Sequence, residues 1–402
     1  MAKPQAPVLT LENLEMKKTL VALAALSAMS AFAQSSVTIY GALDAGYANS
    51  TLSSGGGAGT TLHKANVTGG SSYTSRIGFT GVEDLGAGQS AGFTYEVALS
   101  SLGGDAANSG AFATSQTSGL RTGAVYIKDA QLGQVTAGYG MTLRHSQAAT
   151  LDMTGGANLA GNLMTAVGVG HATTAAPAGT TAGAYTNMDY LLRANGVAYT
   201  TPTMGGVSVT YGHVFGDNQT NTNNTSAETA NSNLRADMIG LSYANGPLTV
   251  LASTTRTVAD NGIAGATGAT NGQARTNTIV GAIYDFGFAK VSAGAYQDKN
   301  QYQNQAGGVD TGDILNRGYQ VGIRGAIPGT KAELLTQMAH GSYTTGGEAA
   351  EQRMQAGRQF GAIYNFSKRT SAYALYGTQT RDVVGQDAAV DKVYAVGLRH
   401  NF

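Results

Sequence analysis

Residues 391–402, DKVYAVGLRHNF, end the chain and point to a closed sheet. Side chains alternate between the two faces of an extended strand, so one face of this stretch is largely apolar and the other is small or polar. The apolar face carries Tyr394, Val396, Leu398, His400 and Phe402. A chain that ends on such a strand leaves an open apolar edge, which promotes aggregation unless a partner covers it. In a closed barrel the first strand is that partner.

A matching first strand lies at 36–48. Val37, Ile39 and Tyr47 would share one face of it, and Asp44 would lie on the other. One face suits lipid and the other suits water. The alternative is a soluble sandwich of half-buried strands, because alternation within single segments is also typical of that fold.

Residues 16–33, MKKTLVALAALSAMSAFA, have the pattern of a secretory signal peptide. Two lysines precede a short apolar run, and the run ends in the small-x-small sequence AFA. We expect translation to start at Met16 and cleavage after Ala33, so that 1–33 form an extension and signal peptide and 34–402 form the barrel. The alternative, a retained membrane anchor, would need a longer apolar run.

The composition fits an exported envelope protein. The chain has no cysteine, which excludes disulfides and cysteine-bound metal, and its formal net charge of zero argues against nucleic acid as a partner. Only 12% of the residues are charged, against about 25% in an average protein. A wall with one face in lipid and one face lined by small polar residues needs few charges. No cofactor or metal is expected.

Sixteen segments with strand character follow residue 34. They lie at approximately 36–48, 73–83, 89–101, 119–131, 134–143, 189–200, 206–216, 233–244, 247–257, 274–286, 288–298, 315–327, 330–343, 354–366, 370–381 and 390–402. Short turns alternate with long polar loops, which we expect at 49–72, 102–118, 217–232, 258–273 and 299–314. This alternation is typical of outer-membrane barrels, whose short turns face the periplasm. The sequence therefore predicts an all-β fold, a 16-stranded antiparallel transmembrane β-barrel.

Aromatic girdles at the two membrane interfaces must consist of tyrosine and phenylalanine, because the sequence has no tryptophan. Tyr284, Phe286, Tyr364 and Phe366 lie near predicted strand ends and are the candidates.

The connection 145–188 is much longer than the others. It is rich in Ala, Gly, Thr and Met, and Asp152 is its one acidic residue. A segment of this composition is better suited to pack against a wall than to extend into water. We expect it to fold into the barrel as a constriction loop; the alternative is a disordered surface insertion.

Five stretches of the chain resemble the general porins of Gram-negative bacteria, of the betaproteobacterial type. They are SSVTIYGALDAGY (35–47), SRIGFTGVEDLGAGQSAGFTYEVAL (75–99), GQVTAGYG (133–140), RANGVAYTTPTMGGVSVTY (193–211) and YAVGLRHNF (394–402). The resemblance implies a homotrimer in the outer membrane, surrounded by lipid and lipopolysaccharide, with one pore in each barrel and an inward-folded third external loop. It also implies that the barrel assembly machinery reads a C-terminal signal, here Tyr394, Val396, Leu398 and Phe402.

Porins of this type carry wall arginines that face the constriction loop. The matching positions are Arg76, Arg121 and Arg193, with Glu96 as the opposing acid on the wall and Asp152 as the acid on the loop. Strand alternation places Arg76 and Glu96 inside, but it groups Arg121 and Arg193 with outward residues, so a β-bulge or a position above the membrane is needed to reconcile them. For any single arginine the alternative is a solvated charge at the rim.

One departure from the family concerns the end of the fifth wall strand. Gly138 and Tyr139 stand where the family commonly has Gly-Arg, and Arg144 is a candidate replacement.

The resemblance and these charges predict passive diffusion of small hydrophilic solutes with a modest preference for anions, because guanidinium groups stay charged. The alternatives are a substrate-specific outer-membrane channel and a secreted adhesin or structural β protein. A sugar channel would be expected to show a track of aromatic residues along the lumen, and none is evident. The six histidines belong to no catalytic motif, so no enzyme is expected.

Overall fold

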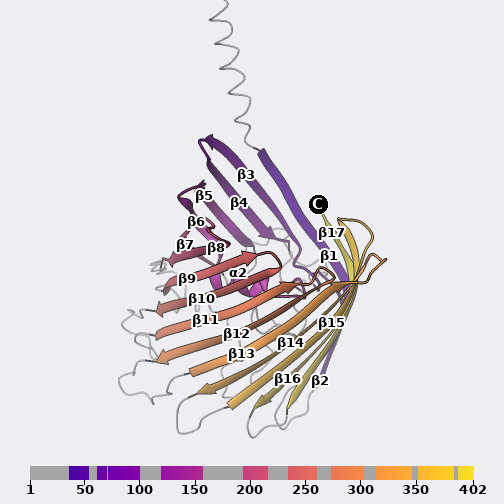
Figure 1. Cartoon of the computed structure of the whole chain (residues 1–402). Helices are drawn as coiled ribbons and strands as arrows, with labels where there is room; N and C mark the ends of the chain where they lie inside the picture. Colours follow the sequence, from indigo (N-terminus) through magenta and orange to yellow (C-terminus); the bar gives the residue numbers. More distant parts are fainter. Residues whose placement is uncertain are drawn as a thin grey trace, which may run out of the picture.

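The computed structural model describes residues 36–53, 61–69, 71–99, 119–156, 193–215, 234–259, 273–302, 314–345, 352–383 and 388–402. The predicted start, signal peptide and cleavage site lie outside these residues and stay predictions. The described residues form one antiparallel sheet that closes on itself around a single short helix (Figure 1). Among them, no helix is long and apolar enough to span a membrane.

The strands follow the predicted order. They are β1 (Ser36–Ser53), β2 (Thr61–Thr68), β3 (Arg76–Gly86), β4 (Gln89–Ala98), β5 (Leu120–Asp129), β6 (Gly133–Met141), β7 (Arg193–Thr200), β8 (Val207–Val214), β9 (Leu234–Asn245), β10 (Leu248–Ala259), β11 (Gln273–Asp285), β12 (Ala289–Tyr302), β13 (Ile314–Ala326), β14 (Ala332–Thr345), β15 (Gln352–Asn365), β16 (Thr370–Val383) and β17 (Ala389–Asn401). The helix, α2 (Leu143–Thr150), follows β6. All sixteen predicted strands are confirmed.

Closure of the sheet takes place between β1 and β17. Their register runs from Ala42 opposite Asn401 to Thr51 opposite Lys392. Gly41 and Phe402 exchange two backbone hydrogen bonds of 3.1 Å each. The apolar edge of the last strand is therefore covered, as the sequence predicted.

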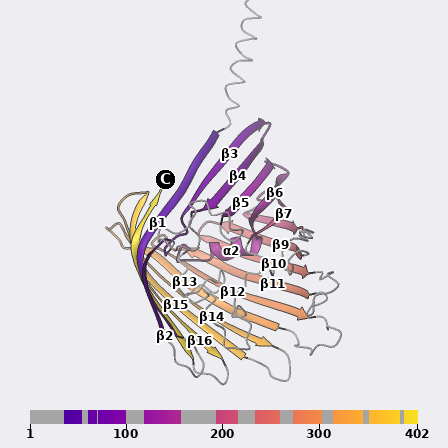
Figure 2. The ribbon, with the colours of Figure 1, turned by 180° about the vertical axis from the view of Figure 1, so that it is seen from behind.

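The sequence was wrong about 49–72, which we expected to be a loop. β1 extends to Ser53, and β2 pairs with its second part, whereas β3 pairs with its first part. Figure 2 shows β3 beside the beginning of β1 and β2 near its far end. The two strands share one position in the wall, so seventeen strands fill sixteen positions. The break between them lies at 69–75.

The two faces of the wall follow the predicted alternation. In β17, Val393 and Ala395 are buried, whereas Tyr394 and Leu398 are 55% and 56% exposed. The predicted girdle residues are also exposed on the outside and form aromatic pairs, Tyr284 with Phe286 and Tyr364 with Phe366, with ring centroids 4.6 and 5.2 Å apart. The inner face carries polar side chains. Among them are Gln320, Gln337, Gln359 and Gln379.

The barrel has a short wall and a long wall. Strands β3 to β8 have 8 to 11 residues each, whereas β9 to β17 have 12 to 14. The helix α2 lies inside and contacts β9, β10 and β11, on the long wall (Figures 1 and 2). Among the described residues, the inserted helix therefore lies against the long wall.

Candidate functional site

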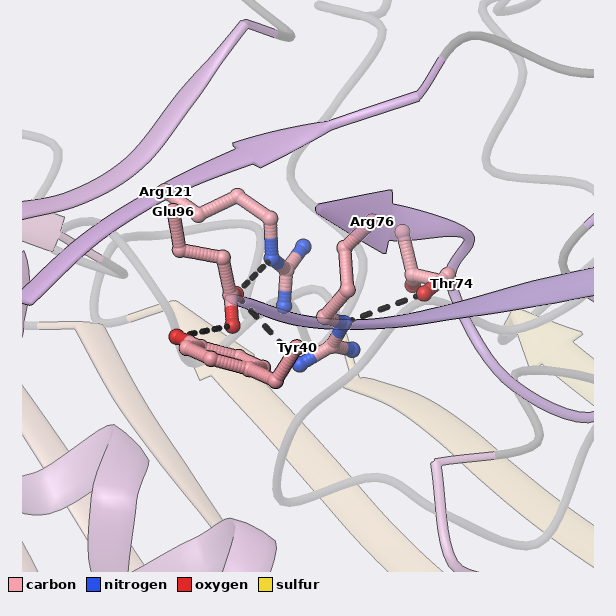
Figure 3. Close-up of polar contacts among 5 residues, drawn as sticks. All are labelled: Tyr40, Thr74, Arg76, Glu96 and Arg121. Carbon is pink, nitrogen blue, oxygen red and sulfur yellow. Dashed lines mark hydrogen bonds and ion pairs between the residues drawn. The ribbon is translucent and has the colours of Figure 1, made fainter. Parts of the chain in front are cut away.

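Glu96, on the inner face of β4, lies at the centre of a charged cluster. Its Oε1 lies 2.6 Å from Nε of Arg121 and 3.4 Å from Nη1 of Arg76. Its Oε2 accepts a hydrogen bond of 3.0 Å from the hydroxyl of Tyr40 on β1. Figure 3 shows these side chains converging from β1, β3, β4 and β5. The structure thus brings together three of the residues that the sequence singled out.

A β-bulge explains how Arg121 reaches the lumen. The register between β4 and β5 shifts between Glu96, opposite Thr122, and Val97, opposite Leu120, so that Arg121 is an extra residue on β5. An extra residue changes which side of the sheet the following side chains occupy. The alternation that grouped Arg121 with outward residues therefore does not hold here, and of the two explanations that the sequence left open the structure contains the bulge.

Arg193 extends the cluster toward β7, where it is the first residue of the strand. It lies opposite Met141 of β6 and close enough to Arg121, Glu96 and Arg76 for their charges to interact. Its Nε is buried, and no hydrogen-bond partner for it is found in the part of the chain that the structure describes. Two guanidinium groups thus contact one wall carboxylate, and a third lies close enough to interact with it electrostatically.

A second feature of the lumen, segment 71–75, was not predicted from the sequence. This segment joins β2 to β3 and is tied to the fully buried Asp44 of β1. Asp44 Oδ2 accepts hydrogen bonds from the backbone N–H groups of Ser72 and Tyr73, at 3.2 and 2.9 Å. Its Oδ1 accepts a bond of 2.7 Å from the hydroxyl of Tyr373. An acid on the inner face of the first strand was the signal in the sequence that could have revealed this anchor.

Tyr73 connects this segment with the arginines. The guanidinium carbon of Arg76 lies 4.0 Å from the centroid of the Tyr73 ring, and that of Arg399, on β17, lies 5.4 Å away. Both distances are within the range of cation–π attraction. A Cβ atom at Gly156 would lie 3.7 Å from Cδ2 of Tyr73. The segment from the β1 side and the chain after α2 therefore meet inside the barrel.

The chain that begins at α2 is held on the long wall by hydrogen bonds and by glycines. Gln147 donates from Nε2 to the carbonyl oxygens of Leu241 and Ala252, at 3.3 Å each. A Cβ atom at Gly281 would lie only 2.4 Å from Cδ1 of Leu151, so a larger residue there would displace the loop. Gly322 leaves space for the side chain of Met153 in the same way. These contacts confirm that the first part of the predicted constriction loop folds inward; residues 157–188 lie outside the described residues.

Arg144 strengthens this attachment. Its Nη2 lies 3.5 Å from Oδ1 of Asp298 on β12, and the two side chains are only 5% and 4% exposed. Asn277 also donates a hydrogen bond to Asp298. The structure therefore places Arg144, which the sequence offered as a replacement for a family arginine, in the anchor of the helix.

Asp152 is buried in the turn after α2. Its carboxylate accepts hydrogen bonds from the N–H and hydroxyl of Thr154, at 2.8 and 2.6 Å, from the N–H of Gly156 at 2.9 Å, and from Nε2 of Gln337 at 3.1 Å. Burial raises the pKa of Asp152, although these four bonds favour its charged form. Its contacts are those of a residue that shapes and anchors the loop, and its part in the constriction stays a prediction.

The arrangement offers charges and stacking surfaces. In the described part of the chain, no group of three or more His, Asp or Glu side chains could hold a metal ion. Fixed guanidinium groups around a single wall carboxylate can attract and orient passing anions.

Comparison with known proteins agrees with this geometry. A family model described as Gram-negative porin matches residues 19–383. The chain is 29% identical over 389 residues to the outer membrane porin protein 32 of Delftia acidovorans, covering 96% of this chain and 95% of the relative. It is 27% identical over 419 residues to an outer membrane porin protein of Bordetella pertussis, covering 96% of this chain and 100% of the relative.

A comparison with solved structures also finds a porin. The anion-selective porin from Comamonas acidovorans superposes with a TM-score of 0.65 and 25% sequence identity, covering 92% of this chain and 100% of that one. With a closed sixteen-position barrel, an inward-folded loop and full-length matches to outer-membrane porins, the chain belongs to the family of Gram-negative porins.

Proposed function

We propose that this outer-membrane porin passes small hydrophilic solutes passively and prefers anions. The observation that carries the proposal is the charge of the cluster on the short wall: Arg76, Arg121 and Arg193 supply three positive charges against the one negative charge of Glu96. Guanidinium groups keep their charge at any physiological pH, so the excess persists. The similar Comamonas protein is named an anion-selective porin, which supports the same preference here.

The zero-current potential across a planar bilayer in asymmetric KCl tests this proposal. We expect a potential of the sign that marks chloride as the more permeant ion, and Arg76→Glu should move it toward potassium. The matched control is Arg358→Glu, because Arg358 is an exposed arginine on the outer face of β15. An unchanged potential in Arg76→Glu, or an equal shift in the control, would refute the role of the cluster.

A homotrimer is part of the proposal, and the short wall supports it. A strand of 8 residues such as β8 measures roughly 26 Å along its axis, and at a tilt of about 40° it covers only about 20 Å of an apolar band about 25 Å tall. Strands of 13 residues such as β11 cover the band fully. The short wall therefore fits against neighbouring subunits better than against lipid. A trimer should migrate slowly in SDS until boiled and should open bilayer conductance in steps of three.

The C-terminal assembly signal and the lipopolysaccharide contact complete the proposal. Tyr394, Val396 and Leu398 all point outward and are more than half exposed, so a chaperone or assembly machine can read them before the strand is covered. Deleting Phe402 should reduce the amount of heat-modifiable barrel in cells while leaving export through the inner membrane intact. Equal amounts of folded barrel with and without Phe402 would contradict this assignment. Lipopolysaccharide that co-purifies with the wild-type trimer would support the proposed contact with lipopolysaccharide.

A substrate-specific channel remains the second candidate function. Liposome-swelling rates for neutral sugars and for organic anions of equal size separate the two. A general porin should rank solutes by size and charge, whereas a specific channel should saturate with one solute.

A further inference from the structure

The outer face of the long wall contains an apolar groove of about 840 Å³. Two small residues, Ala362 on β15 and Ala374 on β16, are direct neighbours in the register and form part of its lining. Leu334 and Val396 flank them on either side, because Leu334 opposes Ala362 and Val396 opposes Ala374. Alanine beside exposed leucine and valine leaves a hollow in an otherwise continuous apolar surface.

Aromatic rings form one side of this groove. Phe360, Tyr376 and Tyr394 follow each other across β15, β16 and β17. The rings of Tyr376 and Tyr394 lie 4.9 Å apart, and Phe360 is 51% exposed. The other end of the groove reaches Ile327 and Pro328 in the turn between β13 and β14. The groove therefore runs along the membrane-facing surface to the rim that carries the short turns.

Two short turns at that rim carry exposed positive charges. Lys331 follows β13, and Lys368 and Arg369 lie between β15 and β16; all three are exposed. Lys331 Nζ donates a hydrogen bond of 3.3 Å to the carbonyl of Phe366, which joins the two turns. Residues 326–332 and 365–370 contain no acidic residue. Three cations are thus gathered at the mouth of an apolar groove.

Other short turns do not share this charge. Those after β3, β5 and β11 each contain an aspartate, Asp84, Asp129 or Asp285, which accepts a backbone hydrogen bond within its turn. The charge is therefore a local property of the two turns beside the groove. It is also separate from the arginines of the lumen, which face the opposite side of the wall.

We propose that this face binds an anionic phospholipid of the periplasmic leaflet, with its phosphate at Lys331, Lys368 and Arg369 and an acyl chain in the groove. A phosphate next to an apolar chain matches three cations next to an apolar groove, and such basic sites at membrane level attract anionic headgroups. The rim is periplasmic because it carries the short turns and both ends of the barrel, where Asn401 donates a backbone hydrogen bond to Arg369. The position of the three cations at the periplasmic rim favours a phospholipid of the periplasmic leaflet over lipopolysaccharide. The strands of the long wall are long enough to span the membrane without a neighbouring subunit. Lipid is therefore a better occupant of the groove than a second subunit.

Lipid titration of the purified, detergent-solubilised protein, followed by native mass spectrometry, tests the proposal. The probes are phosphatidylglycerol and phosphatidylethanolamine with identical acyl chains. We expect tighter binding of phosphatidylglycerol, and we expect K331Q/K368Q/R369Q to lower its affinity about tenfold and to remove the difference between the two lipids. The matched control is R317Q/R358Q/K392Q, which removes three exposed cations from the outer face of the same wall, away from the short turns.

A second variant separates the groove from the charges. A362F/A374F should fill the groove and weaken both lipids, while single-channel conductance and heat-modifiability stay at wild-type values because the lumen is untouched. The proposal is overturned if K331Q/K368Q/R369Q binds phosphatidylglycerol as the wild type does, or if the control triple variant weakens it equally. It is also overturned if the first triple variant loses lipopolysaccharide and retains phosphatidylglycerol.

Discussion

Arg121 lies on a β-bulge directly beside Glu96, and the distance of 2.6 Å between Nε and Oε1 makes this the shorter of the two arginine contacts of that carboxylate. Glu96 compensates part of the positive charge of the arginines around it on the inner face of the wall. Removing the acid and removing a base should therefore have opposite effects on ion selectivity.

Glu96→Gln should make the pore more selective for anions. The change removes the one negative charge that contacts Arg76 and Arg121, and the amide oxygen can still accept a hydrogen bond from Tyr40. The zero-current potential in asymmetric KCl measures the effect. Glu83→Gln is the control, since Glu83 is an exposed acid of the same strand pair that makes no contact with these arginines. A shift toward cations in Glu96→Gln would contradict the prediction.

Tyr373→Phe should loosen segment 71–75. The substitution removes the 2.7 Å hydrogen bond to Asp44 and should lower the free energy of unfolding by about 1–3 kcal/mol, because a buried charged acceptor loses one partner. Urea unfolding in detergent measures this loss. Tyr376→Phe serves as control, since Tyr376 lies on the outer face and stacks on Tyr394. Equal free energies of unfolding for Tyr373→Phe and the wild type would show that this hydrogen bond does not stabilise the protein.

Gly281→Ala should displace the inserted loop. The new methyl group would lie 2.4 Å from Cδ1 of Leu151, and overpacking of this kind costs about 1–3 kcal/mol. The temperature at which the folded band disappears in SDS should fall. Gly140→Ala should be tolerated, because the nearest atom to its methyl would be Cγ2 of Thr122 at 3.9 Å. The double variant Gly281→Ala/Leu151→Ala should recover part of the loss, since the carbonyl oxygen of Ala293 would still lie 2.9 Å from the new methyl group; no recovery would show that the clash with Leu151 is not the main cause.

Arg144→Gln should release α2 from β12. Breaking one partner of a buried ion pair typically costs about 3–5 kcal/mol, because the remaining carboxylate of Asp298 stays buried without its charged partner. We expect larger fluctuations of the open-channel current in single-channel records, since the helix would move within the pore. Arg144→Gln/Asp298→Asn should restore a quiet current. A quiet current in the single variant would mean that hydrogen bonds from Gln147 hold the helix without help.

Strand positions and faces were accessible from the sequence because lipid and water select different side chains on alternate residues. The stretch 391–402 and its outward Tyr394 and Leu398 show this directly. Arg121 was accessible only through family resemblance, since a bulge depends on how two strands pair and not on the residues of one strand. β2 could not be predicted from local sequence either, because its pairing with the end of β1 is a long-range contact.

The helix α2 could not be predicted for a similar reason. Its sequence, LRHSQAAT, contains good helix formers, but eight residues without a side-chain N-cap are too short to form a stable helix alone, and contacts with β9, β10 and β11 stabilise it. Asp152 was expected to be the acid on the constriction loop, and its hydrogen bonds to Thr154, Gly156 and Gln337 become visible only once the turn and β14 are placed together. Local sequence carries no information about a partner 185 residues away.

The attachment points of the inserted loop have a consequence for biogenesis. The loop follows β6 in the chain, yet Gln147, Leu151 and Met153 rest on β9, β10, β12 and β14, which are synthesised after it. The loop therefore has no docking surface until most of the cylinder exists. A nascent barrel should pass through a stage that is wide and unselective, and the narrow passage should be the last part of the molecule to mature.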